Sequence, residues 1–346
     1  DGQLPAAPAI TVRVCDGLIC EMAGAKDLLA RLPALLGGEV RVIPAPCIGR
    51  CDSAPAAVVH QCPVPHAMPQ AVLNVVTAGR TTDVVQGHVD LATYVAQGGY
   101  RLLQQCHGGQ RPADSVIQAL EGSGLRGLGG AGFPAGRKWR IVREQPAPRL
   151  LAVNADEGEP GTFKDRWLLE RDPHRFLEGV FVAAWAVGVE RVFIYLRDEY
   201  HGCRALLQRE LDGLRAQPPV SGLPAVELRR GAGAYVCGEE SAMIESIEGR
   251  RGLPRLRPPF VAERGLFGRP TLVHNVETLF WVREIVERGG DWFAAHGRHG
   301  RSGLRRFSVS GRVVEPGVKL APAGITLREL IDEYCGGMQA GHELYA

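Results

Sequence analysis

Four cysteines near the start of the chain have the spacing of a metal site. Four residues separate Cys15 from Cys20, three separate Cys47 from Cys51, and each pair follows a segment that we expect to be a strand. Four thiolates suit a [2Fe–2S] cluster, in which each iron takes two sulfur ligands, and they equally suit a tetrahedral zinc ion. Reduced core cysteines are the third interpretation, and spacing alone does not choose among these.

The remaining cysteines are isolated in the sequence. Nine cysteines are an odd number, so a complete set of internal disulfides is impossible, and a secreted disulfide scaffold is not expected. We expect the isolated ones to be small buried hydrophobic residues. They are Cys62, Cys106, Cys203, Cys237 and Cys335.

A glycine-rich loop at residues 127–132 (GLGGAG) fits the G-x-G-x-x-G pattern of dinucleotide-binding folds. That fingerprint must follow a strand, whereas residues 114–122 read as a helix. The loop still offers backbone N–H groups free of side chains beside Arg126, Arg137 and Lys138. Such a nest suits a phosphate or a flat ring, and a flexible turn is the alternative.

Acidic residues follow the strand expected at residues 149–154. Asp156, Glu157 and Glu159 lie within four positions, and the carboxyl ends of parallel strands are where open α/β sheets bind ligands. Because these carboxylates repel one another, we expect hydrogen-bond donors such as ribose or ribityl hydroxyls to compensate them. A solvated acidic loop is the alternative interpretation.

A second loop, at residues 231–241, repeats this design with a strand, a glycine turn and a pair of acids that open a helix. The helix dipole is a sufficient structural explanation for Glu239 and Glu240. Two loops of this kind in one sheet nevertheless favour a shared binding site.

The hydrophobic pattern predicts a small α/β unit followed by a larger one. In the first hundred residues, strands are expected at 10–14, 39–43, 56–60 and 72–76, and helices at 23–36 and 83–95. The elements that follow indicate helical layers around a mostly parallel sheet. Helices are expected at 115–121, 178–187, 206–214, 241–248 and 278–287, and strands at 149–154, 191–195 and 226–229. After a basic hinge at 298–306, a strand at 307–314 and a helix at 327–334 begin a unit that stops too soon for a finished fold. We therefore expect the chain to be part of a longer protein.

Composition narrows the class of protein. With 346 residues, of which 45% are hydrophobic, two or three domains are expected. The 40 Lys and Arg residues balance 38 Asp and Glu residues, which argues against nucleic acid or an anionic membrane as a partner. No run of about 18 apolar residues and no signal peptide is evident, so a soluble cytoplasmic protein is expected.

Taken together, these segments resemble the flavin-bearing, NADH-oxidising subunit of respiratory complex I and its relatives in NAD-dependent formate dehydrogenases and NAD-reducing hydrogenases. The resemblance runs from about residue 115 to residue 300 and is specific, because five motifs occur in order. They are residues 124–134 (GLRGLGGAGFP) with Lys138 and Trp139, 154–166 (NADEGEPGTFKDR), 231–241 (GAGAYVCGEES), 258–260 (PPF) and 271–278 (TLVHNVET).

The resemblance implies that the glycine loop is an FMN site and assigns roles to particular residues. Two departures from the family pattern are Leu128, where Arg is usual, and His274, where Asn is common. The residues implied to bind NADH are Phe133, Glu157, Glu159 and Phe260. Those implied to surround FMN are Gly127, Gly129, Gly130, Lys138, Asn154, Asp156, Tyr235, Gly238, Glu239, Glu240, Asn275 and Thr278.

The resemblance also predicts three domains. Residues 1–97 resemble a thioredoxin-like [2Fe–2S] ferredoxin, which favours a cluster over zinc at Cys15, Cys20, Cys47 and Cys51. Residues 98–303 would form a Rossmann-like FMN- and NADH-binding α/β domain, and residues 304–346 the start of a ubiquitin-like (SLBB) domain. The ligands of the [4Fe–4S] cluster expected in the family are not in these residues.

The implied activity is that of a diaphorase subunit, in which flavin mediates between a two-electron hydride donor and one-electron clusters. No protein group is expected to act as a catalytic acid, base or nucleophile. The amino-acid sequences of residues 271–283 and 334–345 favour an NAD-dependent formate dehydrogenase. Its partners would be a small [2Fe–2S] ferredoxin-like subunit and a large molybdenum- or tungsten-containing subunit. A hydrogenase, complex I and a redox-inactive assembly scaffold are the alternatives.

Overall fold

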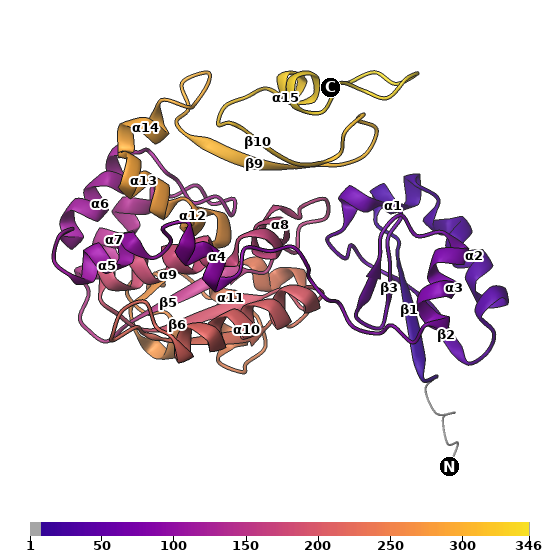
Figure 1. Ribbon diagram of the computed structural model, residues 1–346, viewed down its shortest axis with the longest axis horizontal. Coiled ribbons are helices and arrows are strands. Elements are labelled where there is room, and N and C mark those ends of the chain that lie inside the picture. Colours follow the sequence, from indigo (N-terminus) through magenta and orange to yellow (C-terminus); the bar gives the residue numbers. More distant parts are fainter. Residues whose placement is uncertain (1–7, 346) are drawn as a thin grey trace, which may run out of the picture.

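The computed structural model describes residues 8–345, which fold into three units in chain order (Figure 1). The N-terminal unit, in indigo, lies beside a larger central unit. A C-terminal hairpin, in orange, and a helix, in yellow, lie along the upper side of this view. Within the described residues, no helix combines the length and the apolar character needed to cross a bilayer.

The N-terminal unit has the predicted thioredoxin-like layering. Its sheet has the order β2-β1-β3-β4, in which β1 pairs parallel with β2 and antiparallel with β3. Apolar residues of β1 alternate toward helices α2 and α3, and Val12, Val14 and Leu32 are fully buried there. The elements are β1 (Ile10–Cys15), α1 (Leu18–Met22), α2 (Ala25–Leu36), β2 (Val40–Ala45), β3 (Ala57–Val59), β4 (Cys62–Val64) and α3 (Pro69–Thr77).

Two predictions in this region are wrong. The strand expected at residues 72–76 is part of helix α3, because Pro69 starts a helix well and Val72 and Val75 meet the core at helical spacing. Most of the helix expected at residues 83–95 is a segment without regular secondary structure. Only α4 (Leu91–Ala96) is helical, and it begins where the side chain of Asp90 accepts a hydrogen bond from the backbone N–H of Thr93 at 2.8 Å.

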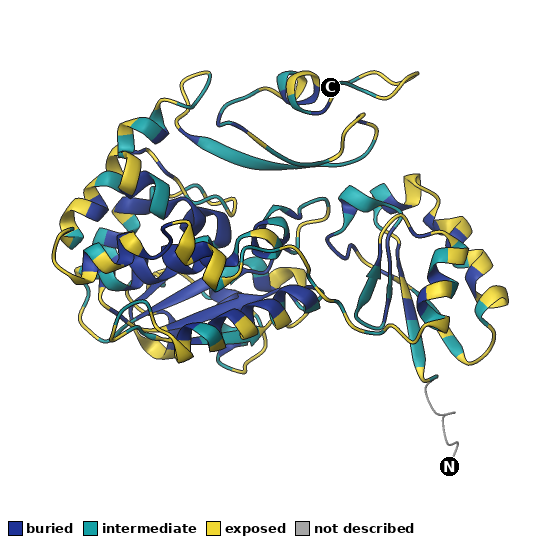
Figure 2. Cartoon of the chain, in the orientation of Figure 1, coloured by how far each residue is buried: buried dark blue, intermediate teal, exposed yellow. Residues whose placement is uncertain are grey.

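The central unit is built on a four-stranded sheet of order β7-β6-β5-β8, in which all pairs are parallel, as predicted. Because the strands are parallel, the loops that follow β5, β7 and β8 emerge at one edge. The sheet is enclosed by helices, and its strands β5, β6 and β8 are mostly buried (Figure 2). The strands are β5 (Arg149–Ala155), β6 (Val189–Leu196), β7 (Ala225–Arg230) and β8 (Thr271–Asn275).

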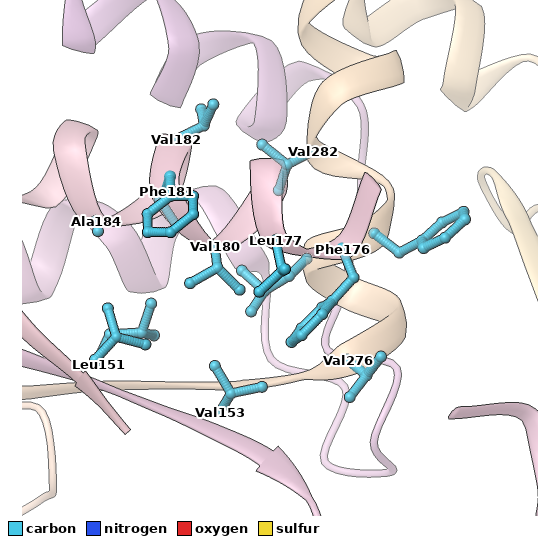
Figure 3. Close-up of a cluster of buried hydrophobic side chains, with 14 of the residues drawn as sticks. Leu151, Val153, Phe176, Leu177, Val180, Phe181, Val182, Ala184, Val276 and Val282 are labelled. Atoms are coloured by element: carbon cyan, nitrogen blue, oxygen red, sulfur yellow. The ribbon is translucent and has the colours of Figure 1, made fainter. Parts of the chain in front are cut away.

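Helix α9 (Pro173–Val187) is the core of this unit. Almost every residue of α9 is buried, and Phe176 and Leu177 point toward Val153 of β5 and Val276 (Figure 3). The predicted helix at residues 278–287 is divided in two at Trp281, and α5 and α8 were not predicted. The other helices are α5 (Arg101–His107), α6 (Ala113–Gly122), α7 (Ala135–Arg143), α8 (Lys164–Arg171), α10 (His201–Ala216), α11 (Glu240–Ile247), α12 (Val276–Phe280), α13 (Val282–Arg288) and α14 (Gly290–Ala294).

The C-terminal unit is an antiparallel hairpin of β9 (Leu304–Val309) and β10 (Gly317–Pro322), followed by α15 (Leu327–Tyr334). Thr326 and Glu329 form a reciprocal capping box that starts α15 where the sequence predicts it. Four of the five isolated cysteines are buried, as predicted, and Cys62 is half-buried.

Shortening a core side chain of α9 should destabilise the central unit. Leu177→Ala removes a fully buried side chain and should lower the free energy of unfolding by about 2–5 kcal/mol, because a cavity remains. Urea unfolding followed by tryptophan fluorescence measures this change. Leu327→Ala, at a residue that is 55% exposed, is the control and should have no measurable effect. Equal losses for the two variants would contradict this description of the core.

Candidate functional site

A cavity of about 630 Å³ lies at the carboxyl edge of the parallel sheet. It is enclosed by the glycine loop before α7, the acidic loop after β5, the loop between β7 and α11, and the end of β8. The predicted glycine and acid loops are therefore brought together in space. The lining residues are Leu128, Gly129, Gly130, Asn154, Asp156, Glu157, Gly158, Glu159, Thr162, Lys164, Asp165, Tyr235, Val236, Gly238, Glu239 and Asn275.

Asp156 lines this cavity and has one carboxylate oxygen that is unsatisfied. Its Oδ2 atom is buried and has no hydrogen-bond partner among the described residues. Burial raises the pKa of Asp156 to about 6. An orphaned buried acceptor is costly, so a ligand that donates a hydroxyl here would relieve that cost.

Asn154 ties the two loops around the cavity together. Its Nδ2 atom donates to the carbonyl of Gly238 at 2.8 Å, and its Oδ1 atom accepts from the backbone N–H of Asp156 at 3.1 Å. Across the same opening, the hydroxyl of Tyr235 donates to Glu159 at 2.5 Å. These contacts fix the spacing of the two walls.

The glycine loop follows helix α6 rather than a strand, which supports the argument against an ordinary dinucleotide fingerprint. Gly129 packs so tightly that an added Cβ would lie 2.9 Å from the Cβ atom of Asn275, and Gly130 has a φ of +113°. The N–H of Leu128 donates to the hydroxyl of Thr278 at 2.9 Å. Thr278 therefore holds the loop from outside the cavity.

Three other residues of the expected FMN set, Gly127, Lys138 and Glu240, also do not line the cavity. The ammonium of Lys138 donates to the carbonyl of Val273 at 3.1 Å, and burial lowers the pKa of this lysine. Glu240 pairs with Arg257 at 3.0 Å. These residues surround the cavity without opening onto it.

Glu239 is a helix cap that also lines the cavity. Its carboxylate accepts hydrogen bonds from the backbone N–H groups of Ser241 and Ala242, both at 2.9 Å. Burial would raise the pKa of Glu239, but the hydrogen bond from the Ser241 hydroxyl, followed by these two backbone hydrogen bonds, outweighs burial and lowers the pKa. The structural explanation for this acid is therefore correct, and the residue is available to a ligand as well.

His274 is turned away from the cavity. Its Nε2 atom accepts a hydrogen bond from Trp139 Nε1 at 2.8 Å in the core, and burial holds the pKa of His274 well below its ordinary value. This histidine is thus accommodated between β8 and α7. Leu128, the other residue expected to depart from the family pattern, does line the cavity.

Glu157 lines the cavity, yet its carboxylate is occupied by protein donors. It accepts from the N–H groups of Asp165 and Arg166, at 3.1 and 3.3 Å, and from the hydroxyl of Tyr200 at 2.9 Å. Burial, and then the charge of Asp165, raises the pKa of Glu157 to about 7.

Lys164 and Asp165 are site residues that the sequence analysis did not single out. The Lys164 ammonium lies 2.7 Å from Asp165 and 3.2 Å from Glu277, and Asn275 donates to Asp165 at 2.6 Å. A lone lysine within the acidic segment 154–166 was the available signal. The pair places compensated charge on the cavity wall.

Two aromatic residues of the expected NADH set lie outside the cavity lining. Phe133 is 38% exposed and Phe260 is 54% exposed, so both rings are accessible to solvent. The side chains of Arg137 and Lys138 lie 5.8 and 5.9 Å from the centre of the Phe133 ring.

The four N-terminal cysteines form one buried group at the carboxyl ends of β1 and β2. The Cys47 and Cys51 sulfurs are 3.4 Å apart. The thiol of Cys15 is hydrogen-bonded to the thiols of Cys20 and Cys47, and these hydrogen bonds raise the pKa of Cys15. The described residues contain no set of three or more metal-binding side chains around a single point. The grouping fits a two-iron cluster, which distributes its thiolates over two metal ions.

Replacing the carboxyl of Asp156 should flatten the dependence of stability on pH. Since the folded protein holds this proton more tightly than the unfolded chain, the stabilisation is complete below about pH 4 and is lost as the pH rises to about 6. In the wild-type protein this proton makes the free energy of unfolding fall by about 2–3 kcal/mol over that range. Asp156→Asn should remove this fall, which urea unfolding at several pH values measures. Asp212→Asn, at an exposed position, is the control. An unchanged slope in Asp156→Asn would contradict the assignment.

Comparison with known proteins identifies two families in this chain. Residues 120–284 match the family described as the Nuo51 FMN-binding domain, and residues 4–80 match the thioredoxin-like [2Fe-2S] ferredoxin family. The chain is 45% identical over 279 residues to a subunit of the NADH-quinone oxidoreductase of Rhizobium meliloti, covering 77% of this chain and 65% of that protein. It is 47% identical over 240 residues to the mitochondrial NADH-ubiquinone oxidoreductase 51 kDa subunit of Neurospora crassa, covering 66% of this chain and 49% of that protein.

Among solved structures, the chain is similar to one from an NAD+-reducing [NiFe]-hydrogenase in the H2-reduced state. The TM-score is 0.80 at 36% identity, and the match covers 93% of this chain and 60% of that one. The chain therefore spans 49% to 65% of the length of these relatives. Together the matches show that the chain contains a Nuo51 FMN-binding domain preceded by a thioredoxin-like [2Fe–2S] ferredoxin domain.

Proposed function

We propose that this chain is the NADH-oxidising part of a flavoprotein subunit that moves electrons between NAD(H), FMN and a [2Fe–2S] cluster. The observation that carries the proposal is the 630 Å³ cavity, whose glycine loop, acids and amides converge at one edge of the sheet. When bound there, FMN supplies the conversion between two-electron hydride chemistry and one-electron transfer.

The residues around the cavity divide into two groups in this proposal. The first group lines the cavity and contacts the flavin nucleotide directly. It consists of Gly129, Gly130, Asn154, Asp156, Tyr235, Gly238, Glu239 and Asn275. Gly127, Lys138, Glu240 and Thr278 instead hold these lining residues in position. The orphaned oxygen of Asp156 supports a contact with a ribityl hydroxyl, since it needs a donor.

NAD(H) binds at the open side of the cavity in this proposal, beside Glu159 and the accessible rings of Phe133 and Phe260. The rings suit stacking on adenine. Carboxylates at this opening bind ribose hydroxyls and repel a 2′-phosphate, so NAD is favoured over NADP. Glu157 has no free carboxylate oxygen to offer in the same way, and it acts by fixing the loop that carries Glu159.

Catalysis by this chain would consist of binding and orienting the two nucleotides. Hydride transfer needs the donor and acceptor rings held face to face, which is a matter of position rather than of acid–base chemistry. We therefore assign no catalytic acid, base or nucleophile.

The larger enzyme is proposed to be a soluble NAD-dependent formate dehydrogenase, with a small [2Fe–2S] subunit and a large molybdenum- or tungsten-containing subunit. The amino-acid sequences of residues 271–283 and 334–345 support this proposal, as does the fused N-terminal unit. The second candidate is an NAD-reducing hydrogenase, favoured by the structural match that covers 93% of this chain. Metal analysis of the complex that co-purifies with the chain separates them, because molybdenum or tungsten indicates formate and nickel indicates hydrogen.

Purified protein should be coloured and should respond to NADH. We expect a flavin absorbance band that bleaches when NADH is added anaerobically, because the cavity brings the two nucleotides together. Absorbance spectroscopy with NADH, and with NADPH as the comparison, measures this response. A colourless protein would contradict the proposal. So would a flavin band that bleaches to the same extent with NADPH as with NADH when both are added at the same low concentration.

Filling the glycine loop should remove the flavin. Gly129→Ala places a methyl group 2.9 Å from Asn275, so the loop must shift, and we expect the flavin content of the purified protein to fall at least several-fold. Fluorescence of flavin released by heating measures this content. Gly122→Ala, at the end of α6 where an added Cβ meets nothing within 4 Å, is the matched control and should keep its flavin.

A further inference from the structure

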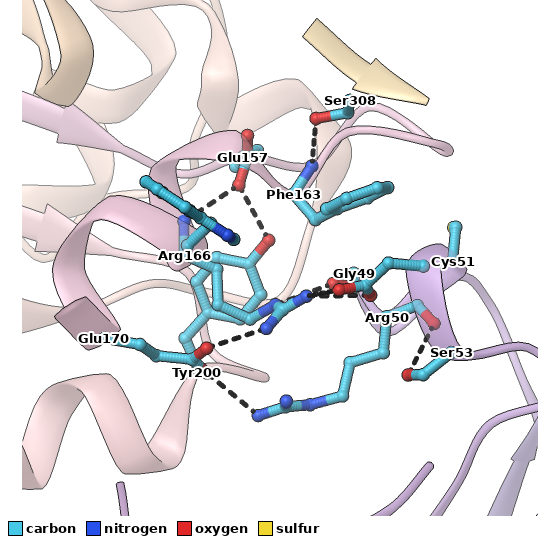
Figure 4. A network of polar contacts seen from close by, with 12 residues as sticks. Gly49, Arg50, Cys51, Ser53, Glu157, Phe163, Arg166, Glu170, Tyr200 and Ser308 are labelled. Atoms are coloured by element: carbon cyan, nitrogen blue, oxygen red, sulfur yellow. Dashed lines mark hydrogen bonds and ion pairs between the residues drawn. The ribbon is translucent and has the colours of Figure 1, made fainter. Parts of the chain in front are cut away.

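The N-terminal unit docks on the central unit through the loop that carries its second pair of cysteines (Figure 4). At the tip of this loop Gly49 has a φ of +71°, and an added Cβ would lie 2.6 Å from the hydroxyl oxygen of Tyr200. The carbonyl of Cys47 accepts a hydrogen bond from Arg197, which also donates to the carbonyl of Glu157 at 2.6 Å. The loop is therefore clamped by residues of the central unit.

Arg166 contributes several hydrogen bonds to this clamp. Its side chain is 4% exposed. Its Nε atom donates to the carbonyl of Gly49 at 3.0 Å, and its Nη2 atom donates to the two carboxylate oxygens of Asp52 at 2.9 and 3.1 Å. The Nη1 atom donates to Glu170 at 2.8 Å. One guanidinium thus holds both the backbone and a side chain of the cysteine loop.

The segment that carries Arg166 is also fixed at the cavity. The N–H of Arg166 donates to the Glu157 carboxylate, and the preceding Asp165 lines the cavity. Phe163, three positions before Arg166, is fully buried in the hydrophobic core of the N-terminal unit. Arg166 consequently has little freedom to move relative to the cysteine loop.

We propose that Arg166 is a positioning residue that fixes the Cys47–Cys51 loop and raises the reduction potential of the iron–sulfur cluster held by Cys15, Cys20, Cys47 and Cys51. This inference rests on the proposed function, because it requires the cluster. No bond is made or broken in the step concerned, in which the cluster gains one electron and therefore one negative charge.

The sign of the effect follows from the charges beside the loop. A buried cation favours the more negative reduced cluster, and the neighbouring carboxylate of Asp52 opposes it. The other acid partner, Glu170, is also paired with Arg50 at 3.2 Å. Removing the guanidinium should therefore lower the potential, and removing the Asp52 charge should raise it.

Two substitutions break the same ion pair but change the charge in opposite directions. Arg166→Gln should shift the one-electron equilibrium of the cluster about tenfold toward the oxidised form, which corresponds to about 59 mV. Asp52→Asn should shift it toward the reduced form, and Arg166→Lys should recover part of the loss. The measurement is a redox titration of the purified holoprotein followed by electron paramagnetic resonance. Arg283→Gln, which removes an arginine bonded to the Gly98 carbonyl and Glu287, is the control and should leave the potential unchanged.

The outcomes separate this inference from the proposed function. Opposite shifts in the two variants support it, whereas shifts in the same direction, or none, show a merely structural contact and overturn it. If Arg166→Gln does not fold, the upward shift in Asp52→Asn decides the question. A wild-type protein that has no cluster signal, yet bleaches with NADH, overturns the inference and leaves the flavin function standing.

Discussion

Burial of the Glu157 carboxylate is the interaction on which the rest of the site depends. A buried carboxylate must be supplied with donors, and here they come from the first N–H groups of α8 and from Tyr200. Holding Glu157 in this way fixes the start of α8. That helix then presents Lys164 and Asp165 to the cavity and Arg166 to the cysteine loop, so one acid orients groups toward both of these places.

The cavity also depends on residues that never reach it. Thr278 holds the glycine loop through a backbone N–H, Lys138 bonds a strand carbonyl, and His274 bonds Trp139 in the core. Their contribution is to keep flexible glycine segments in one arrangement, which is what binding a flat ring requires.

Local patterns in the sequence predicted most of the strands and the two glycine-and-acid loops, because alternation and glycine placement are local properties. They failed where tertiary contacts decide. The β-branched run at residues 72–76 became helical once Pro69 started α3 and its valines met the core. Helix α8 was missed since its apolar positions are interrupted by charges that contact other units. The Arg166–Gly49 hydrogen bond joins residues 117 apart, a pairing that no local pattern indicates.

Phe163 has a consequence for any attempt to divide or recombine this protein. Although it belongs to the central unit, its ring completes the apolar interior of the N-terminal one. A fragment cut between the two would be left with a hole lined by hydrocarbon, and a transplanted ferredoxin unit would need an aromatic side chain from its new host. Joining the two units therefore requires this packing contact as well as a linker.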